Sequence, residues 1–159
     1  MSTEKTLPAV TLRLMTEAEF GPWREISLID YTASLASANG LDAKAASDMA
    51  GGHYDRLLPD GVSTTEHLLW FALDEGEPVG SLWIHVKNGK SAFIYMLLVD
   101  ADQRGRGYGR AIMLAAEDEC RARDLDRLEL NVFGQNRTAI NLYDSLGYEV
   151  TTQQMRKLL

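Results

Sequence analysis

The stretch that decides the fold is Arg104-Gly105-Arg106-Gly107-Tyr108-Gly109. It follows an apolar run that ends at Val99, and it opens a segment, residues 107–123, whose apolar side chains recur with the period of a helix. Glycines that alternate with larger residues lack Cβ atoms, so several backbone N–H groups can surround one anion. The start of the helix adds unpaired N–H groups and a partial positive charge, and the arginines add full charges. The stretch therefore predicts a pyrophosphate site between a strand and a helix.

Two other phosphate-binding turns fit this spacing poorly. A P-loop needs a lysine followed by serine or threonine after its last glycine, whereas Gly109 is followed by Arg110 and Ala111. A dinucleotide site would find an acidic residue in Glu129, but the glycines do not follow G-x-G-x-x-G and three antiparallel strands are expected upstream. A capping turn that binds no ligand is the remaining alternative on these residues alone.

The segments upstream of the turn predict two helices and four strands. A strand is expected at residues 10–14, a helix from the capping-box pattern at Thr16 towards Gly40 with Pro22 inside it or restarting it, and a second helix after Asp42. Residues 67–73, 79–87 and 91–99 read as strands of an antiparallel meander, with Asn88-Gly89 as a tight hairpin turn.

Downstream of the helix at residues 107–123, a strand is expected at residues 128–132. Asn136 then reads as a helix N-cap, Gly147 as the residue just past that helix, and Tyr148 onward as a final strand. Strands joined through a helix are usually parallel, so the sheet should be mixed. The predicted fold is α/β, of the α+β kind, with a mixed, mostly antiparallel central sheet of six to seven strands flanked by about four helices.

Composition limits the class of protein. The 159 residues suit a single domain, 1–159, and no stretch approaches the roughly 20 apolar residues of a membrane span. Residues 1–5 carry no sign of a targeting signal, so we expect a cytoplasmic protein without a membrane partner. Cys120 is the single cysteine, which excludes an internal disulfide and a thiolate-rich metal cluster, and no metal site is expected. The net charge of -7 disfavours nucleic acid and slightly favours cationic amines.

Residues 97–147 resemble the GCN5-related N-acetyltransferase (GNAT) superfamily. Its signature, Gln/Arg-x-x-Gly-x-Gly/Ala, is matched by residues 104–109, and its second block is matched by Asn136, Tyr143 and Gly147-Tyr148. The resemblance implies a GNAT-type acyl-CoA N-acyltransferase fold, acetyl-CoA as cosubstrate, a small-molecule or peptide amine as acceptor, and a homodimer as a family habit.

The resemblance also implies roles for individual residues. The cofactor-binding set would be Leu97, Leu98, Val99, Arg104, Gly105, Arg106, Gly107, Tyr108, Gly109, Arg110 and Asn136. Backbone groups at Leu97 and Val99 would bind the pantetheine arm where two strands splay, and residues 105–110 would hold the pyrophosphate. The amine would attack the thioester directly, the Val99 N–H would stabilise the oxyanion, and Tyr143 would act as general acid. Asn136 and Tyr143, almost two helical turns apart, are expected to point along one face towards the splay.

The general base is left open by the sequence. Many members carry a glutamate on the fourth strand, where this chain reads Phe93-Ile94-Tyr95-Met96. The candidates are Glu66, His85, Tyr95, Glu129 and a water chain. Aromatic surface for the acceptor could come from Trp23, Tyr31, His53, Tyr54, Trp83 and Tyr95. A non-catalytic acyl-CoA-binding module and a transferase of longer acyl groups are the alternative functions.

Overall fold

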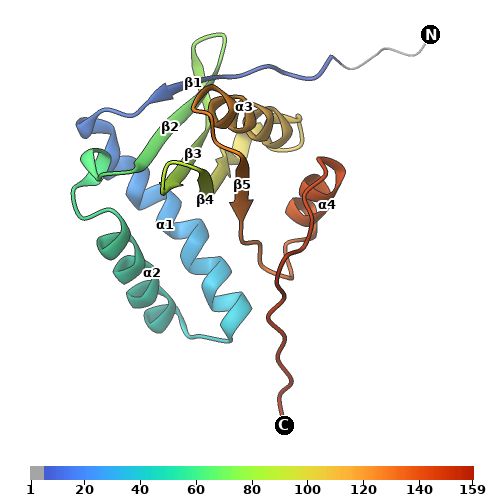
Figure 1. Cartoon of the computed structure of the whole chain (residues 1–159). Coiled ribbons are helices and arrows are strands. Elements are labelled where there is room, and N and C mark those ends of the chain that lie inside the picture. Colours follow the sequence, from blue (N-terminus) through green and yellow to red (C-terminus); the bar gives the residue numbers. More distant parts are fainter. Residues whose placement is uncertain (1–5) are drawn as a thin grey trace.

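A mixed five-stranded sheet with helices on both faces forms the centre of the protein (Figure 1). The computed structural model describes residues 6–159, so residues 1–5, where no targeting signal is predicted, lie outside the described residues. The elements are β1 (Thr11–Leu14), α1 (Glu17–Asn39), α2 (Ala43–Leu57), η1 (Gly61–Ser63), β2 (His67–Asp74), β3 (Glu77–Lys87), β4 (Ser91–Val99), η2 (Ala101–Gln103), α3 (Tyr108–Ala122), β5 (Arg127–Leu130) and α4 (Arg137–Ser145). The strand order is β1-β2-β3-β4-β5, antiparallel except for the parallel pair of β4 and β5.

The first two helices begin at the residues that the local signals indicate, and the first also ends where its signal lies. The Thr16 N–H donates to Glu19 Oε1 at 2.9 Å, and α1 runs through Pro22 to Gly40, which takes a left-handed conformation with φ 63°. Pro22 therefore lies inside the helix and does not restart it. Asp42 caps α2 by accepting a hydrogen bond from an N–H of the first turn at 2.8 Å.

The β3–β4 hairpin confirms the turn predicted at Asn88-Gly89. Both residues have positive φ, 52° and 65°, and the Lys90 N–H donates to the Lys87 carbonyl at 3.1 Å, which closes the turn. The turn sets the register in which His85 faces Phe93.

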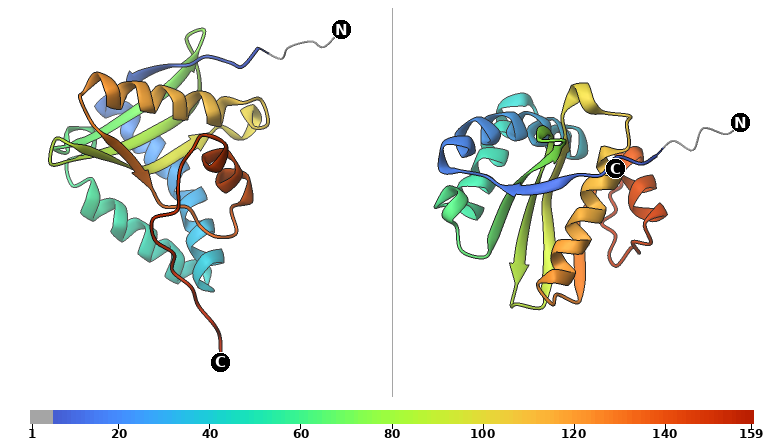
Figure 2. Two further views of the ribbon diagram at one scale, coloured as in Figure 1. Left: turned by 45° about the vertical axis from the view of Figure 1, so that its right-hand side comes forward. Right: turned by 90° about the horizontal axis from the view of Figure 1, so that it is seen from above.

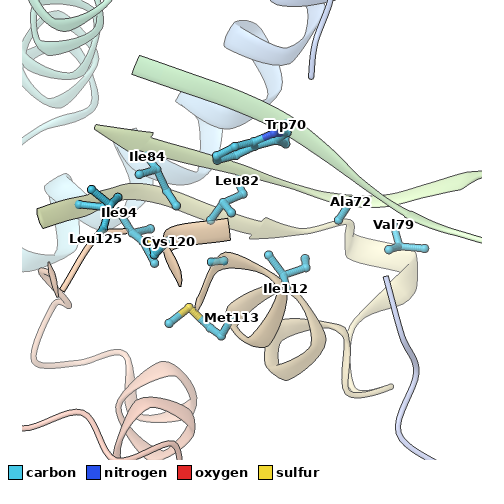
Figure 3. Packing of buried hydrophobic residues seen from close by; sticks show 12 residues of the cluster. Trp70, Ala72, Val79, Leu82, Ile84, Ile94, Ile112, Met113, Cys120 and Leu125 are labelled. Atoms are coloured by element: carbon cyan, nitrogen blue, oxygen red, sulfur yellow. The ribbon is translucent and has the colours of Figure 1, made fainter. Parts of the chain in front are cut away.

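Two hydrophobic clusters lie on opposite faces of the sheet (Figure 2). Helices α1 and α2 cover one face, where the buried members are Met15, Trp23, Tyr54, Leu58, Leu69 and Trp83. Helix α3 covers the other face, and Figure 3 shows its Ile112, Met113 and Cys120 against Leu82 and Ile84 of β3. None of the helices in residues 6–159 combines the length and the apolar character that crossing a bilayer requires.

Two sequence predictions about strands are wrong. Strand β5 ends at Leu130, so Val132 lies outside it, and residues 148–159 form no strand. The described sheet therefore has five strands and not six to seven. The physical reason is that a strand exists only through pairing, and no main-chain hydrogen bond joins residues 149–159 to any described part of the chain. The α+β class, the mixed sheet and four α-helices are confirmed.

Candidate functional site

The glycine turn presents free main-chain donors at the start of α3. Gly105 and Gly107 have φ of 75° and 90°, which glycine adopts without steric penalty. The first helical hydrogen bond runs from the Ala111 N–H to the Gly107 carbonyl at 3.1 Å. The N–H groups of residues 105–110 therefore have no main-chain acceptor within residues 6–159. This arrangement of donors at a helix N-terminus suits an anion.

The Arg104 side chain links the turn to α1 and β4. Its guanidinium pairs with Asp30 of α1 at 3.0 Å, and its Nε donates to the carbonyl of Val99 at 3.2 Å. The sequence singled out Arg104 for its charge. In the structure that charge is matched by a carboxylate, so the side chain connects α1, the end of β4 and the turn.

Other side chains of the turn are also engaged. The Tyr108 hydroxyl donates to the Asp74 carboxylate, and this hydrogen bond is the main cause that raises the pKa of Tyr108. Arg110 donates to Ser145 Oγ of α4 at 2.6 Å. Arg106 is exposed and has no ion pair in the described part of the chain. Among the described residues, Arg106 and Arg110 therefore both carry a positive charge that no carboxylate matches, and Arg106 is the one whose guanidinium makes no hydrogen bond.

Strands β4 and β5 separate next to this turn. Their parallel pairing runs from Ser91 opposite Arg127 to Ile94 opposite Leu130, and β4 then continues to Val99 paired with β3 only. A register shift between β3 and β4 leaves Tyr95 without a partner, which is a β-bulge at the point where the separation begins. Residues 95–99 thus have one open side, as the resemblance implied.

The main chain of β4 alternates between β3 and this open side. The Leu98 carbonyl approaches Gly80 so closely that a Cβ on Gly80 would lie 2.3 Å from its oxygen, and the Asp100 N–H donates to a β3 carbonyl at 2.9 Å. Successive residues of a strand direct their N–H and C=O groups to opposite sides. The groups of Leu97 and Val99 therefore point into the opening, whereas those of Leu98 face β3.

Helix α4 packs against the glycine turn through Leu142. A Cβ on Gly109 would lie 3.3 Å from Leu142 Cδ2, so the missing side chain lets α4 pack closely against the first turn of α3. Tyr143 is half-buried against the cluster under α3, and burial raises its pKa. Its hydroxyl makes no hydrogen bond to another described residue.

Asn136 caps α4 as predicted. Its Oδ1 accepts the Ala139 N–H at 3.2 Å. With ψ of 73° it lies just before the helix, and the expectation that Asn136 and Tyr143 point along one face stays a prediction. Gly147 lies just past the end of α4 with φ of 89°, also as predicted.

Two of the base candidates lie in one row across the sheet. His67, His85, Phe93 and Glu129 are direct partners on β2, β3, β4 and β5. Directly opposed residues share a face, and this row is one residue short of the point where β4 and β5 separate. Glu129 is exposed, and Phe93 stands between it and His85.

His85 has the most distinctive surroundings among the candidates. Its Nδ1 is buried without a hydrogen-bond partner among the described residues, and its Nε2 lies 3.7 Å from Glu66 Oε2. Its ring stacks on His67 with centroids 4.4 Å apart. The Trp83 Nε1–H donates to His67 Nδ1 at 2.9 Å, and burial, then the neighbouring His85, lowers the pKa of His67 to about 4. Tyr95 stacks on Trp83 at 4.9 Å.

The six aromatic residues proposed for the acceptor surface form one contiguous array. Rings contact in the series Trp23–Tyr54, Tyr54–Tyr31, Tyr54–Trp83 and Trp83–Tyr95, and the Tyr31 hydroxyl and His53 Nδ1 are 2.7 Å apart. Trp23, Tyr54 and Trp83 are fully buried and serve as core. Tyr31, His53 and Tyr95 are half-buried and could meet a substrate.

Sequence reasoning missed Asp30 and Gly80. A glycine inside a strand often marks a close backbone approach, so the signal at Gly80 was present. Asp30 lies 74 residues from Arg104 and has no local signal. No group of three or more His, Cys, Asp or Glu side chains in residues 6–159 is arranged to hold a metal ion.

Comparison with known proteins agrees with this geometry. A model of the Acetyltransferase (GNAT) family matches residues 35–148. The uncharacterized N-acetyltransferase YdgE of Bacillus subtilis is 32% identical over 155 residues, which are 95% of this chain and 99% of YdgE. The solved structure of YycN from the same bacterium is 30% identical and has a TM-score of 0.90, covering 95% of this chain and 99% of that chain. A mycothiol acetyltransferase of Beutenbergia cavernae is 42% identical over 83 residues, 51% of this chain and 28% of that protein. The chain therefore belongs to the GNAT family of acetyltransferases, a membership that implies acetyl-CoA as the donor and an amine as the acceptor.

Proposed function

We propose that residues 1–159 act as one domain that transfers the acetyl group of acetyl-CoA directly to a primary amine, with Tyr143 as general acid and His85 as general base. The observation that carries this proposal is the opening between β4 and β5 beside the glycine turn, because it offers main-chain groups for two distinct parts of one extended ligand.

The turn and the opening would bind acetyl-CoA in sequence. The free N–H groups of residues 105–110 and the charge of Arg106 would hold the pyrophosphate. The main-chain groups of Leu97 and Val99 would hydrogen-bond the pantetheine arm, which would take the place of a neighbouring strand. This position would bring the thioester near the bulge at Tyr95. Arg104 would position the turn through Asp30 and Val99 and would not contact phosphate itself.

Direct transfer agrees with the chemistry of the side chains present. Cys120, the single cysteine, lies on the buried face of α3, and burial raises its pKa, so it is a poor nucleophile. In the direct reaction the amine nitrogen bonds to the thioester carbon while the Val99 N–H stabilises the oxyanion. Collapse of the intermediate breaks the C–S bond, and Tyr143 gives its proton to the departing thiolate. A raised pKa keeps the phenol protonated until then. The second proton that the amine nitrogen loses on becoming an amide then restores the Tyr143 phenol, while the first leaves with His85.

His85 is the proposed base because it borders the separation of β4 and β5 and has a buried ring nitrogen without a partner. It would accept a proton from the ammonium form of the substrate, and imidazole is suited to this near neutral pH. Glu66 would stabilise the imidazolium that forms, as a positioning residue. The ring stacked on His85 is His67, whose lowered pKa keeps it neutral, so His67 adds no positive charge next to the imidazolium of His85.

The decisive experiment follows thiol release from acetyl-CoA with a panel of polyamines, aminoglycosides, amino acids, aryl amines and peptides. Tyr143→Phe should lower kcat about 100-fold while the acetyl-CoA Kd stays within about twofold. Tyr148→Phe is the matched control, because Tyr148 is a half-buried tyrosine whose hydroxyl donates to Glu117. Equal kcat values for wild type and Tyr143→Phe would exclude Tyr143 as the acid. Binding of acetyl-CoA without thiol release for any amine would refute the proposal, and longer acyl-CoAs in the same assay measure the chain-length preference.

The base is tested in the same assay by pH. His85→Gln should lower kcat at neutral pH and remove the acidic limb of the rate profile, whereas Glu129→Gln in the same cross-strand row should leave both unchanged. The opposite result would assign the base to Glu129.

A further inference from the structure

A cavity of about 250 Å³ opens between the N-terminal half of α1 and the sheet. Its floor is a cross-strand row, in which Phe71 of β2 faces Ser81 of β3, and Ser81 faces Leu98 of β4. Ser81 and Leu98 are buried, whereas Pro22 and Ile26 of α1 are exposed at the rim. The cavity therefore connects the interior with solvent and can admit a small molecule.

The walls of the cavity are mainly aromatic and aliphatic. Trp23 of α1 is buried, and its Nε1–H donates to Ser81 Oγ at 3.0 Å, so the indole is held in place and its polar atom is satisfied. Phe71, Ile26 and Leu98 add apolar surface. An apolar cavity of about 150 Å³ accommodates a benzene ring. This cavity therefore has room for a ring with a short chain.

Two hydrogen-bond acceptors at the cavity are available to a ligand. Asp100, at the end of β4, is half-buried, and its carboxylate has no hydrogen bond or ion pair within residues 6–159. Burial, then the neighbouring Asp102, raises the pKa of Asp100, as expected for a carboxylate without a paired cation. Pro22 has no N–H, so the Ala18 carbonyl lacks the helical hydrogen bond that position 22 would otherwise donate. Both groups need a donor.

The charge at the cavity is negative because the neighbouring arginines are already paired. Glu19 lines the cavity, and its two oxygens each accept a hydrogen bond from Arg13 at 2.9 Å. Arg104 is close enough to lower the pKa of Asp100, less than burial raises it, but its guanidinium pairs with Asp30 at 3.0 Å. These two ion pairs cancel, and the charge of Asp100 stays unmatched. An ammonium group among aromatic rings meets all of these conditions.

The cavity lies apart from the proposed reaction centre. Ser81 and His85 point to the same face of β3, but they are four residues apart, which is roughly 13 Å along a strand. Trp83 stands between them, buried, and its Nε1–H donates to His67 and not towards the cavity. A ligand in the cavity would therefore not take the place of the acceptor amine.

We propose that this cavity is a second ligand site, which binds a small primary amine with an aryl group in its ammonium form. The ammonium would donate to the Asp100 carboxylate and to the Ala18 carbonyl. The aryl ring would lie beside Trp23 and Phe71. The inference is independent of the proposed acetyl transfer, and binding requires no acetyl-CoA.

Calorimetric titration with 2-phenylethylamine tests the proposal on the full chain without acetyl-CoA. The expected Kd at neutral pH is about 0.1–1 mM for a ligand of this size. 2-Phenylethanol has nearly the same shape without the charge and should bind about tenfold more weakly or worse. Asp100→Asn keeps the shape of the side chain and should weaken binding of the amine by about tenfold or more. Asp102→Asn, at an exposed neighbour outside the cavity, is the matched control and should change the Kd by less than about twofold.

The indole N–H resonances locate the bound amine. In an isotope-labelled sample, Trp23→Phe and Trp83→Phe assign the two signals. The Trp23 signal should shift more than that of Trp83, because the Trp23 N–H lies at the floor of the cavity and the Trp83 N–H points to His67.

Four outcomes would each overturn the proposal. They are no binding of the amine at about 10 mM, equal affinity for the amine and the alcohol, a Kd that Asp100→Asn leaves unchanged, and a larger shift at Trp83 than at Trp23. The last result would place the amine beside the histidines of the reaction centre. The alcohol and resonance measurements use the unmodified chain, so they decide the question even where Asp100→Asn fails to fold.

Discussion

Replacing Gly80 by alanine is expected to damage both the stability of the sheet and its binding of acetyl-CoA. The new Cβ would lie 2.3 Å from the Leu98 oxygen and 3.0 Å from Ile112 Cδ1. Real Cβ contacts shorter than 3.0 Å essentially do not occur, so the β4 main chain must retreat by roughly 0.7 Å. Overpacking of this kind destabilises by about 1–3 kcal/mol.

These magnitudes translate into two measurements. In a chain of this length, about 1–3 kcal/mol lowers the Tm by roughly 3–10 °C in a thermal melt. The retreat also shifts the main-chain groups of Leu97 and Val99, and one lost hydrogen bond would weaken the acetyl-CoA Kd about tenfold in a calorimetric titration.

Gly52→Ala in α2 is the matched control for this experiment. A Cβ on Gly52 meets nothing within 4 Å, so helix propensity alone should raise stability by up to about 1 kcal/mol and leave the Kd unchanged. A Gly80→Ala protein with the Tm and Kd of wild type would refute the reasoning. It would mean that β3 and β4 do not approach as closely as described.

The remaining predictions concern the turn, the cap and the stacked histidines. Gly105→Ala and Gly107→Ala should each destabilise the protein by about 1–2 kcal/mol, because both positions have positive φ. The Gly107→Ala variant should be the less stable one, because its Cβ would also meet Pro8 Cδ at 3.2 Å. Chemical denaturation measures both variants, and equal stabilities would exclude the Pro8 contact. Asn136→Ala should lower the free energy of unfolding by about 1 kcal/mol through loss of the helix cap, whereas Asn136→Asp keeps the cap. If Asn136→Asp keeps the stability of wild type but binds acetyl-CoA more weakly, the Asn136 side chain contacts the cofactor. His67 has a folded pKa of about 4 against an ordinary 6.5, so the folded protein binds this proton less readily and loses stability as the pH falls through that window. After allowance for solvent screening, the loss of stability is of order 1 kcal/mol. Denaturant titrations at pH 7 and pH 4.5 should show this loss in wild type and not in His67→Asn. An unchanged pH dependence in His67→Asn would contradict the assignment of the loss to His67.

Local signals in the sequence predicted the parts of the fold that depend on neighbouring residues. Asp42 and Asn136 cap helices because a short side-chain oxygen reaches an N–H of the first turn, and Asn88-Gly89 forms the hairpin because both residues tolerate positive φ. The turn at residues 104–109 was also predictable from neighbouring residues, since its glycines act through their own backbone.

Features that depend on distant partners were not predictable in this way. The strand expected from Tyr148 failed because a strand needs an edge, and the sequence does not say which edge is free. The partnership of Arg104 with Asp30 crosses 74 residues, and the row that aligns His85 with Glu129 depends on the register of three strand pairs and on the bulge at Tyr95.

The opening between β4 and β5 also determines which kinds of substitution can harm it. Its groups at Leu97 and Val99 belong to the main chain, so most exchanges of these side chains would leave the donors and acceptors in place. Proline at either position deletes an N–H outright, and changes that move the strand, as at Gly80, shift both. The proposed binding surface is made of backbone and is thus tolerant of side-chain variation and sensitive to geometry, and random mutagenesis should find its weak points mainly in glycines and neighbouring strands.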